Sequence, residues 1–275
     1  MKIKTLKKLL GFATVALLGG LVLTGCGKSN ADNSLKNIQN KKELVVGTSA
    51  DYPPFEFQIV KNGHKQIVGY DLMVAQAVAK DMGVKLKVVN TEFPSLISEL
   101  QDKKVDIVMA GMVSTPQRKK AVDFSKSYYT VKNVLLVKKA DADKYNTAAS
   151  LKGKSIGAQQ STTQETIAKK QLSAANLVTE ANFTSLTSEL KNGTLTGVVT
   201  ETEIADNLVS TYPDKYAVAK VPLTTPKEDA QINIAMQKNS PALKKQINKT
   251  ITKLQKNGQL DKMFKKAQQL QLEYK

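Results

Sequence analysis

An alternation of short strands and amphipathic helices, present twice along the chain, is the feature that most constrains the fold. In the first half, β-rich segments at 44–47, 85–89 and 105–109 are separated by segments whose apolar residues recur at helical spacing. After residue 133 the same order starts again. Strands that alternate with helices at this spacing form parallel β-α-β units with helices on the faces of the sheet. The sequence therefore predicts an α/β protein with two similar lobes, each built on a mainly parallel sheet flanked by helices.

Further segments complete the two predicted lobes. Helices are expected at 71–82, 94–101, 164–172, 185–191, 203–210, 241–257 and 259–270, and strands at 133–138, 155–158, 177–178, 197–199 and 232–236. Open parallel sheets bind ligands beyond the carboxyl ends of their strands. Candidate ligand loops therefore follow Val46, Met109, Ala158 and Val199.

The first 25 residues have the composition of an export signal. Four early lysines precede an apolar run from Leu9 to Leu23, which is about 15 residues long and shorter than the roughly 20 of a membrane-spanning helix. The run ends in Leu23-Thr24-Gly25-Cys26, which resembles the bacterial lipobox. That resemblance implies cleavage after the signal peptide 1–25 and a diacylglycerol on the sulfur of Cys26, and two acyl chains suffice for stable anchoring. An ordinary secreted protein is the alternative.

The segment after Cys26 is expected to be a flexible connection. Residues 28–40 are polar, rich in Ser and Asn, and lack periodic apolar residues. We therefore expect residues 26–42 to form a lipidated tether that holds the protein on the extracytoplasmic face of the cell membrane.

Cysteine content and charge restrict the classes of function. Cys26 is the one cysteine in 275 residues, so the folded part cannot rely on a disulfide, a cysteine nucleophile or a zinc–thiolate site. The net charge is +17, but the lysines are scattered in pairs and the chain has no Trp, whereas nucleic-acid binders combine basic patches with stacking aromatics. The sequence contains no P-loop and no Cys/His cluster. We expect a solvated basic surface, no metal or other cofactor, no nucleic-acid partner and a monomeric chain.

A helix start directly after the 105–109 strand is the strongest local candidate for a ligand site. Thr115 has the chemistry of an N-cap and Pro116 suits the first helical position, so free backbone N–H groups face the crevice. Arg118 lies in the first helical turn, where a cation opposes the helix dipole. A bidentate bond to a ligand carboxylate would account for an arginine there, and simple solvation beside Lys119 and Lys120 is the alternative.

The second half contains a comparable helix start. The segment 159–165 follows a strand and offers hydroxyl and amide groups, which can cap the helix or donate to an anion. Glu201 follows the 197–199 strand, where its carboxylate can pair with an ammonium or remain a solvated loop acid. Tyr52 and Tyr70 are either rings that cover a ligand or half-buried aromatics.

Several motifs in a fixed order, between about residues 43 and 267, resemble the polar amino-acid-binding proteins of ABC importers, which form solute-binding protein family 3. The motifs are Gly47-Thr48-Ser49-Ala50-Asp51-Tyr52-Pro53-Pro54-Phe55-Glu56-Phe57, Val68-Gly69-Tyr70-Asp71-Leu72, Thr115-Pro116-Gln117-Arg118, Asp123-Phe124-Ser125, Lys152-Gly153-Lys154, Gln160-Ser161-Thr162-Thr163-Gln164-Glu165 and Asn257-Gly258-Gln259-Leu260. The resemblance implies a type II periplasmic-binding-protein-like clamshell that closes over a free amino acid and delivers it to an ABC permease. We place lobe 1 at 43–130 and 233–275 and lobe 2 at 131–232, with hinges near 128–132 and 230–233.

The resemblance also implies roles for individual residues. Arg118 and the backbone N–H of Thr115 would bind the α-carboxylate from lobe 1, and Thr162 and Thr163 would bind it from lobe 2. Glu201 would bind the α-ammonium. The remaining ligand-binding candidates are the loop positions Ala110 and Val113, the covering ring of Tyr52, and Ser49, Tyr70, Gln159 and Thr200, which would shape the side-chain pocket.

Two departures from the family pattern bear on the ligand. Relatives often have Asp where Glu201 stands, and many have an acid where Ser49 stands. Without an acid at position 49 a cationic ligand side chain lacks one obvious partner. We therefore expect an uncharged polar amino acid, such as glutamine or the cystine/cysteine group, ahead of arginine or lysine.

Other functions remain as alternatives. Binding of a basic amino acid, surface adhesion through the basic exterior, and an enzyme on the same clamshell, such as a dehydratase, are each compatible with part of the sequence. An enzyme needs a positioned acid or base. His64 lies in a polar turn and Glu201 is assigned to the ammonium, so we expect no catalytic residue.

Overall fold

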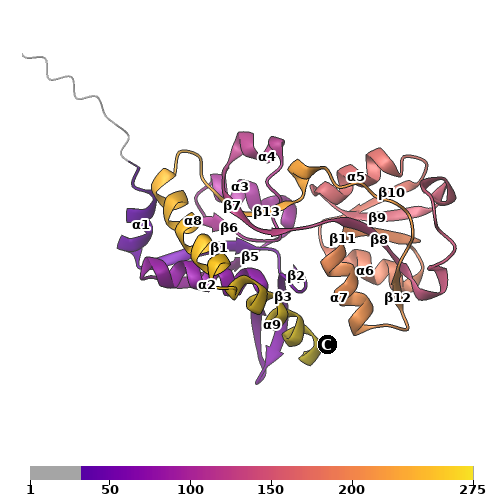
Figure 1. Ribbon diagram of the computed structural model, residues 1–275, viewed down its shortest axis with the longest axis horizontal. Helices are drawn as coiled ribbons and strands as arrows, with labels where there is room; N and C mark the ends of the chain where they lie inside the picture. The colour runs from indigo at the N-terminus through magenta and orange to yellow at the C-terminus, as the bar shows by residue number, and fades with distance from the viewer. Residues whose placement is uncertain (1–31, 275) are drawn as a thin grey trace, which may run out of the picture. The chain divides into compact units, whose positions relative to one another are not determined.

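The computed structural model describes residues 32–274, which contain two five-stranded sheets and one three-stranded sheet (Figure 1). The expected signal peptide 1–25, the lipidation site Cys26 and the start of the expected tether lie outside the described residues. Among residues 32–274, none of the helices combines the length and the hydropathy that a membrane-spanning segment needs.

The first sheet consists, in spatial order, of β5 (Lys85–Asn90), β1 (Glu43–Thr48), β6 (Ile107–Val108), β13 (Gln231–Met236) and β7 (Asp123–Thr130). Strand β1 runs parallel to β5 and β6, whereas β13 runs antiparallel to both β6 and β7. The sheet is therefore mixed, and only its first three strands have the parallel arrangement that the sequence predicts throughout.

Helices cover both faces of the first sheet. The helices of this part of the chain are α2 (Tyr70–Met82), α3 (Leu96–Gln101), α4 (Pro116–Ala121), α8 (Pro241–Lys256) and α9 (Gln259–Glu273). The apolar side chains of α2 and α8 pack with those of β1 in one buried cluster, and those of α3 pack with β6 and β7 in another. Helix α2 forms because Val74, Ala75, Val78 and Ala79 recur on one face, and it ends at Gly83, whose φ of 73° closes the helix.

The second sheet repeats this plan. It consists, in spatial order, of β10 (Asn176–Glu180), β9 (Ser155–Gln159), β11 (Gly197–Glu201), β8 (Asn133–Lys138) and β12 (Tyr216–Val218). The first three strands are parallel, and β8 runs antiparallel to β11 and β12. The helices are α5 (Thr163–Gln171), α6 (Phe183–Asn192) and α7 (Thr202–Thr211); α6 and α7 share one buried cluster, and α5 packs in the cluster on the other face.

The chain crosses between the two sheets twice. It leaves the first sheet after β7 and enters the second at β8, and it returns between β12 and β13 (Figure 1). Strand β8, which follows the first crossing, runs antiparallel to β11, and β13, which follows the second crossing, runs antiparallel to β6. Each sheet is mixed for this reason. Gln231 and Ile232 pair with β7, so the second segment of lobe 1 begins two residues before the boundary expected at 233. We propose these two crossings as the hinge.

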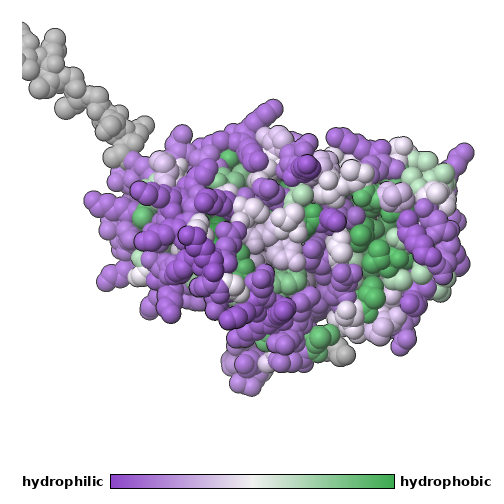
Figure 2. All heavy atoms as spheres, in the orientation of Figure 1, coloured by the Kyte–Doolittle hydropathy of each residue, from purple (hydrophilic) through white to green (hydrophobic). Residues whose placement is uncertain are grey.

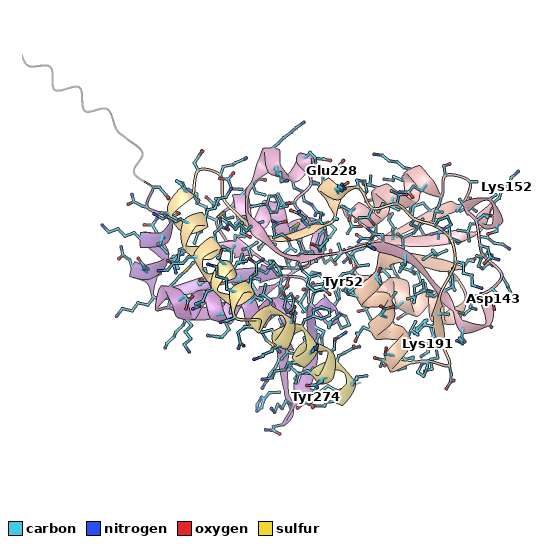
Figure 3. All side chains as sticks on the ribbon, viewed as in Figure 1. Tyr52, Asp143, Lys152, Lys191, Glu228 and Tyr274 are labelled. Atoms are coloured by element: carbon cyan, nitrogen blue, oxygen red, sulfur yellow. The ribbon has the colours of Figure 1, made fainter. Side chains whose placement is uncertain are left out.

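A small three-stranded sheet beside the first sheet, called the hairpin below, was not predicted. Its strands are β2 (Asp51–Tyr52), β3 (Glu56–Lys61) and β4 (His64–Val68), and β3 pairs antiparallel with both of the others. His64 lies at the exposed start of β4, as expected for a polar turn. The hairpin matters for function because β2 carries Tyr52 towards the second sheet (Figure 3).

The expected tether is partly helical. Residues Ser34–Lys41 form α1, which packs against α8, and Ile38 is only 2% exposed. The carboxylate of Asp32 accepts the backbone N–H groups of Ser34 and Ala242, and so connects the start of α1 to α8. The prediction of a tether up to residue 42 is therefore wrong for residues 34–41. A single buried residue on a short helix gives too weak a periodic signal, and the helix is stabilised by docking.

Hydrophilic side chains cover most of the face shown in Figure 2. The ion pairs of the described residues are formed by lysines whose side chains are 42–72% exposed, as in a solvated surface. Exposed pairs of this kind contribute little to stability. The fold is therefore held by its buried clusters.

Candidate functional site

A cavity lies where the carboxyl ends of both sheets meet. Its lining combines residues from the first sheet and the hairpin with residues from the second sheet. The lining residues are Asp51, Tyr52, Glu56, Phe93, Ala110, Gly111, Val113, Arg118, Gln159, Thr162, Thr163, Gln164 and Glu201.

Arg118 reaches the cavity from the first turn of α4. The hydroxyl of Thr115 is the N-cap and accepts the backbone N–H of Arg118 at 3.1 Å, and Pro116 occupies the first turn, as predicted. The guanidinium bends back over this helix start, where it donates to the carbonyl of Val113 at 2.7 Å. Its carbon Cζ lies 5.1 Å from the ring centroid of Phe93. The side chain is thereby held in one orientation at the cavity wall.

The guanidinium of Arg118 also bridges the two lobes. It donates a second hydrogen bond, 2.9 Å long, to the carbonyl of Ser161, which belongs to the loop before α5. Burial lowers the pKa of Arg118 to about 10, which still leaves the group cationic at neutral pH. The site therefore presents a fixed positive charge beside the start of α5.

The start of α5 presents hydroxyl and amide groups to the same cavity. Thr162 is the N-cap, and its hydroxyl accepts the backbone N–H of Glu165 at 3.2 Å and donates to the carbonyl of Gln159 at 2.5 Å. Thr163 is the first helical residue and is only 6% exposed. The positive end of the helix dipole and these donors favour an anionic group near Arg118.

Glu201 lies at the end of β11 with its side chain 3% exposed. One carboxylate oxygen accepts the hydroxyl of Tyr52, and that hydroxyl lies 3.0 Å from the hydroxyl oxygen of Thr200. Burial raises the pKa of Glu201 to about 8, and the charge of Glu203 adds to the effect. The carboxyl therefore lacks a cation that would stabilise its ionised form, and an ammonium in the cavity would supply one.

Tyr52 connects the lobes across the cavity. Its ring packs edge-on against Phe183, with centroids 4.8 Å apart and planes at 85°. Figure 3 shows Tyr52 between the two sheets. A ring in this place can cover the side chain of a bound molecule.

Most of the predicted binding residues line the cavity, but four do not: Tyr70, Ser49, Thr115 and Thr200. Tyr70 is fully buried in the core beside α9, where its hydroxyl donates to the carbonyl of Tyr128 at 3.1 Å. Ser49 is buried and donates to a carboxylate oxygen of Asp51 at 3.0 Å. Thr115 caps α4 rather than lining the cavity. Tyr70 and Ser49 do not line this cavity, and both side chains are hydrogen-bonded to neighbours in the protein.

Five lining residues were missed: Asp51, Glu56, Phe93, Gly111 and Gln164. Glu56 is the most informative, because it is 1% exposed and forms no ion pair among the described residues. Burial, the neighbouring charges of Asp71 and Asp51, and a side-chain hydrogen bond with Asp71 raise its pKa well above the usual range. Glu56 follows Phe55 in one of the family motifs, which was a signal for this residue. The pairing within the hairpin was needed to show which side of the strand faces the cavity.

Asp71 supports the loop that carries Val113. One of its carboxylate oxygens accepts the backbone N–H of Gly111 at 2.9 Å, and the other accepts the hydroxyl of Tyr128 at 2.9 Å. Gly111 has φ +55°, a conformation that favours glycine. Asp71 thus fixes the backbone between Ala110 and Val113.

Comparison with known proteins gives a family model and several relatives that match most of the chain. A model of the family described as bacterial extracellular solute-binding proteins, family 3, matches residues 44–269. The chain is 36% identical over 246 residues to the arginine-binding extracellular protein ArtP of Bacillus subtilis, covering 89% of this chain and 91% of that protein. It is 28% identical over 260 residues to the L-cystine-binding protein TcyJ of Escherichia coli, covering 94% and 93%.

A solved structure shows the same fold. An amino acid ABC transporter substrate-binding protein from Streptococcus pneumoniae, bound to L-arginine, has a TM-score of 0.83 and 37% identity and covers 86% of this chain and 98% of that chain. The predicted two-lobe fold of type II periplasmic binding proteins is therefore confirmed. The chain belongs to family 3 of the bacterial extracellular solute-binding proteins.

Proposed function

We propose that this protein captures a free amino acid with a cationic side chain, arginine in first place, outside the cytoplasm and delivers it to an ABC import permease. The observation that carries the choice of ligand is Glu56, a buried carboxyl that lines the cavity and forms no ion pair among the described residues. A guanidinium can form hydrogen bonds with a carboxylate in bidentate geometry. The names of the arginine-binding relatives point the same way.

The ligand backbone would be held by charges from both lobes. We propose that Arg118, with the N-terminus of α5 at Thr162 and Thr163, binds the α-carboxylate. Glu201 would bind the α-ammonium with help from the loop at 110–113. Transfer of both charged groups out of water is favourable only when each is paired and hydrogen-bonded, so the site is complete only when the lobes meet.

The expected preference for an uncharged ligand rested on Ser49. That argument considered position 49 alone, whereas the hairpin brings the carboxyl of Glu56 to the cavity from another position. A buried carboxyl beside the cavity favours a cationic side chain over glutamine or cystine. The basic amino acid, which was the alternative, therefore becomes the leading proposal.

The remaining parts of the proposal concern mode of action and location. We propose that the protein binds its ligand without chemical change, because Arg118 and Glu201 are both assigned to the ligand's charged groups. We also propose that Cys26 is acylated and anchors the protein to the outer surface of the membrane.

Calorimetry of the protein against all common amino acids, citrulline and cystine tests the ligand. We expect arginine to bind most tightly. Replacing Glu56 by Gln keeps the shape but removes the charge and should weaken arginine binding at least 30-fold, since loss of a buried charge partner costs about 2–5 kcal/mol. Neutral citrulline should be affected much less.

The matched control is Glu43→Gln, whose side chain is 41% exposed and which lies outside the cavity. It should leave arginine affinity unchanged. Tighter binding of glutamine or cystine than of arginine, or an unchanged affinity in the Glu56 variant, would refute the proposed ligand class.

A further inference from the structure

Asp51 joins the two lobes at a place that does not involve Arg118 or Glu201. Its oxygen Oδ2 accepts the backbone N–H of Phe183 at 2.5 Å and faces the side-chain amide of Gln159 at 3.4 Å. Its other oxygen accepts the hydroxyl of Ser49 at 3.0 Å, within the same lobe. A carboxylate from the hairpin is thus hydrogen-bonded to the second lobe.

Phe183 is the first residue of α6, a helix of ten residues capped by Asn182. The N–H groups of a first helical turn have no partner within the helix, and the positive end of the helix dipole favours a carboxylate there. The same residue also packs its ring against Tyr52. The two residues of β2 therefore both contact Phe183: Asp51 contacts its backbone and Tyr52 contacts its side chain.

The contact separates two cavities. Asp51 lines the ligand cavity, and it also lines an outer groove with an empty volume of about 810 Å³. Phe183, Pro53 and residues of α6 and α7 line the groove, which is more open than the ligand cavity. The hydrogen bond between Asp51 and Phe183 lies in the wall between the inner space and the outer one.

We propose that Asp51 and the backbone N–H of Phe183 form a latch that closes the ligand cavity and slows the departure of the bound molecule. The latch rests on the proposed function only in requiring that a small molecule occupies the cavity. Because it forms between the lobes, it stabilises their closed arrangement by a constant amount for every ligand that the closed site accepts. Asp51 is thus a positioning residue, whereas Glu56 discriminates between side chains.

A pair of substitutions at Phe183 isolates the backbone N–H. Phe183→Ala removes the ring and keeps the N–H, whereas Phe183→Pro removes both. Proline is well tolerated at the first position of a helix, and Asn182 already has the extended backbone (φ −110°, ψ 129°) that a residue before proline prefers. The difference between the two variants therefore measures the latch rather than the ring contact with Tyr52.

Stopped-flow measurement of the tyrosine fluorescence change gives dissociation rates for L-arginine and for neutral citrulline. We expect Asp51→Ala to raise both rates by the same factor, on the order of tenfold, which corresponds to about 1.4 kcal/mol. Phe183→Pro should exceed Phe183→Ala by a similar factor. Asp51→Ala should add nothing further in the Phe183→Pro background, because the bond is already lost.

Three outcomes would overturn the latch. A rate increase for arginine alone would make Asp51 a direct partner of the cationic side chain. Equal rates for Phe183→Pro and Phe183→Ala would show that the N–H has no role. If neither ligand binds, the proposed function fails, but the latch can still be tested. The free energy of unfolding is then measured for the Asp51→Ala and Phe183→Pro variants and for the double variant, and zero coupling between positions 51 and 183 rejects the latch.

Discussion

At Glu201 the protein keeps a carboxyl group buried without a cation beside it: no ion pair among the described residues includes it. Its carboxylate accepts the hydroxyl of Tyr52, and that hydroxyl in turn lies 3.0 Å from the hydroxyl oxygen of Thr200. One hydroxyl does not offset the cost of burying a charge, which is why the pKa rises to about 8. A ligand ammonium would change this balance and stabilise the carboxylate.

A proton should therefore leave the protein when an amino acid binds. At pH 7 the carboxyl, with its pKa of about 8, holds a proton, and pairing with the ammonium lowers that pKa. Affinity for arginine should therefore rise with pH up to about 8. Calorimetry at pH 7 in two buffers of different ionisation enthalpy measures the proton released.

The Glu203→Gln variant serves as the control for this linkage. The charge of Glu203 contributes to the raised pKa of Glu201, so its removal should lower that pKa and reduce the proton release at pH 7. Glu56 also has a raised pKa, but Glu203 is not among the causes of that shift. Identical binding heats in both buffers would contradict the expected linkage.

At the scale of helices and strands, α1 shows that packing against another helix can stabilise a short helix whose own propensity is too weak. It is eight residues long, and isolated helices of that length are marginal in water. Ile38 packs in the same buried cluster as Leu243 and Ile247 of α8. The helix is therefore held by the packing of Ile38, with Leu35 partly buried against the same cluster, and by the hydrogen bonds of Asp32.

Replacing Ile38 by Ala should destabilise the protein by about 2–3 kcal/mol, since it removes a buried side chain and leaves a cavity. Lys36→Ala, on the exposed side of the same helix, should be neutral or slightly stabilising because Ala favours helix. Urea denaturation followed by circular dichroism measures both. If the Ile38 variant unfolds at the same urea concentration as the parent, α1 is not docked in solution.

The elements that the sequence predicts well carry their own signals. Helix α2 buries Val74, Ala75, Val78 and Ala79 at helical spacing and is capped by Gly83, and α4 starts at Thr115 and Pro116. The hairpin is different: β4 has no fully buried residue, so its alternation is weak, and its position depends on pairing with β3. Asp51 and Glu56 were missed for the same reason, because the direction of their side chains is set by this pairing. Arg118 and Glu201 could be predicted, since each follows a strand that the pattern identifies.

At the scale of the whole molecule, the binding site exists only between the lobes. Arg118 belongs to α4 beside the first sheet, whereas Glu201 ends β11 in the second sheet. The hydrogen bond from Arg118 to Ser161 and the contact between Tyr52 and Glu201 cross the same gap. A ligand that touches both lobes adds to these contacts, so binding and closure stabilise each other.

Arginine at 100 times its dissociation constant should stabilise the folded protein by about 2.7 kcal/mol and raise the melting temperature by roughly 5–10 °C. Arg118→Ala and Glu201→Gln, which act from opposite lobes, should each abolish this rise while the protein still unfolds cooperatively without ligand. Differential scanning fluorimetry measures the shift, and Lys119→Ala, next to Arg118 but outside the cavity, should retain it. Because the site needs a charge from each lobe, a full shift in either variant would mean that one lobe binds the amino acid alone, and the two-lobe site proposed for this cavity would have to be abandoned.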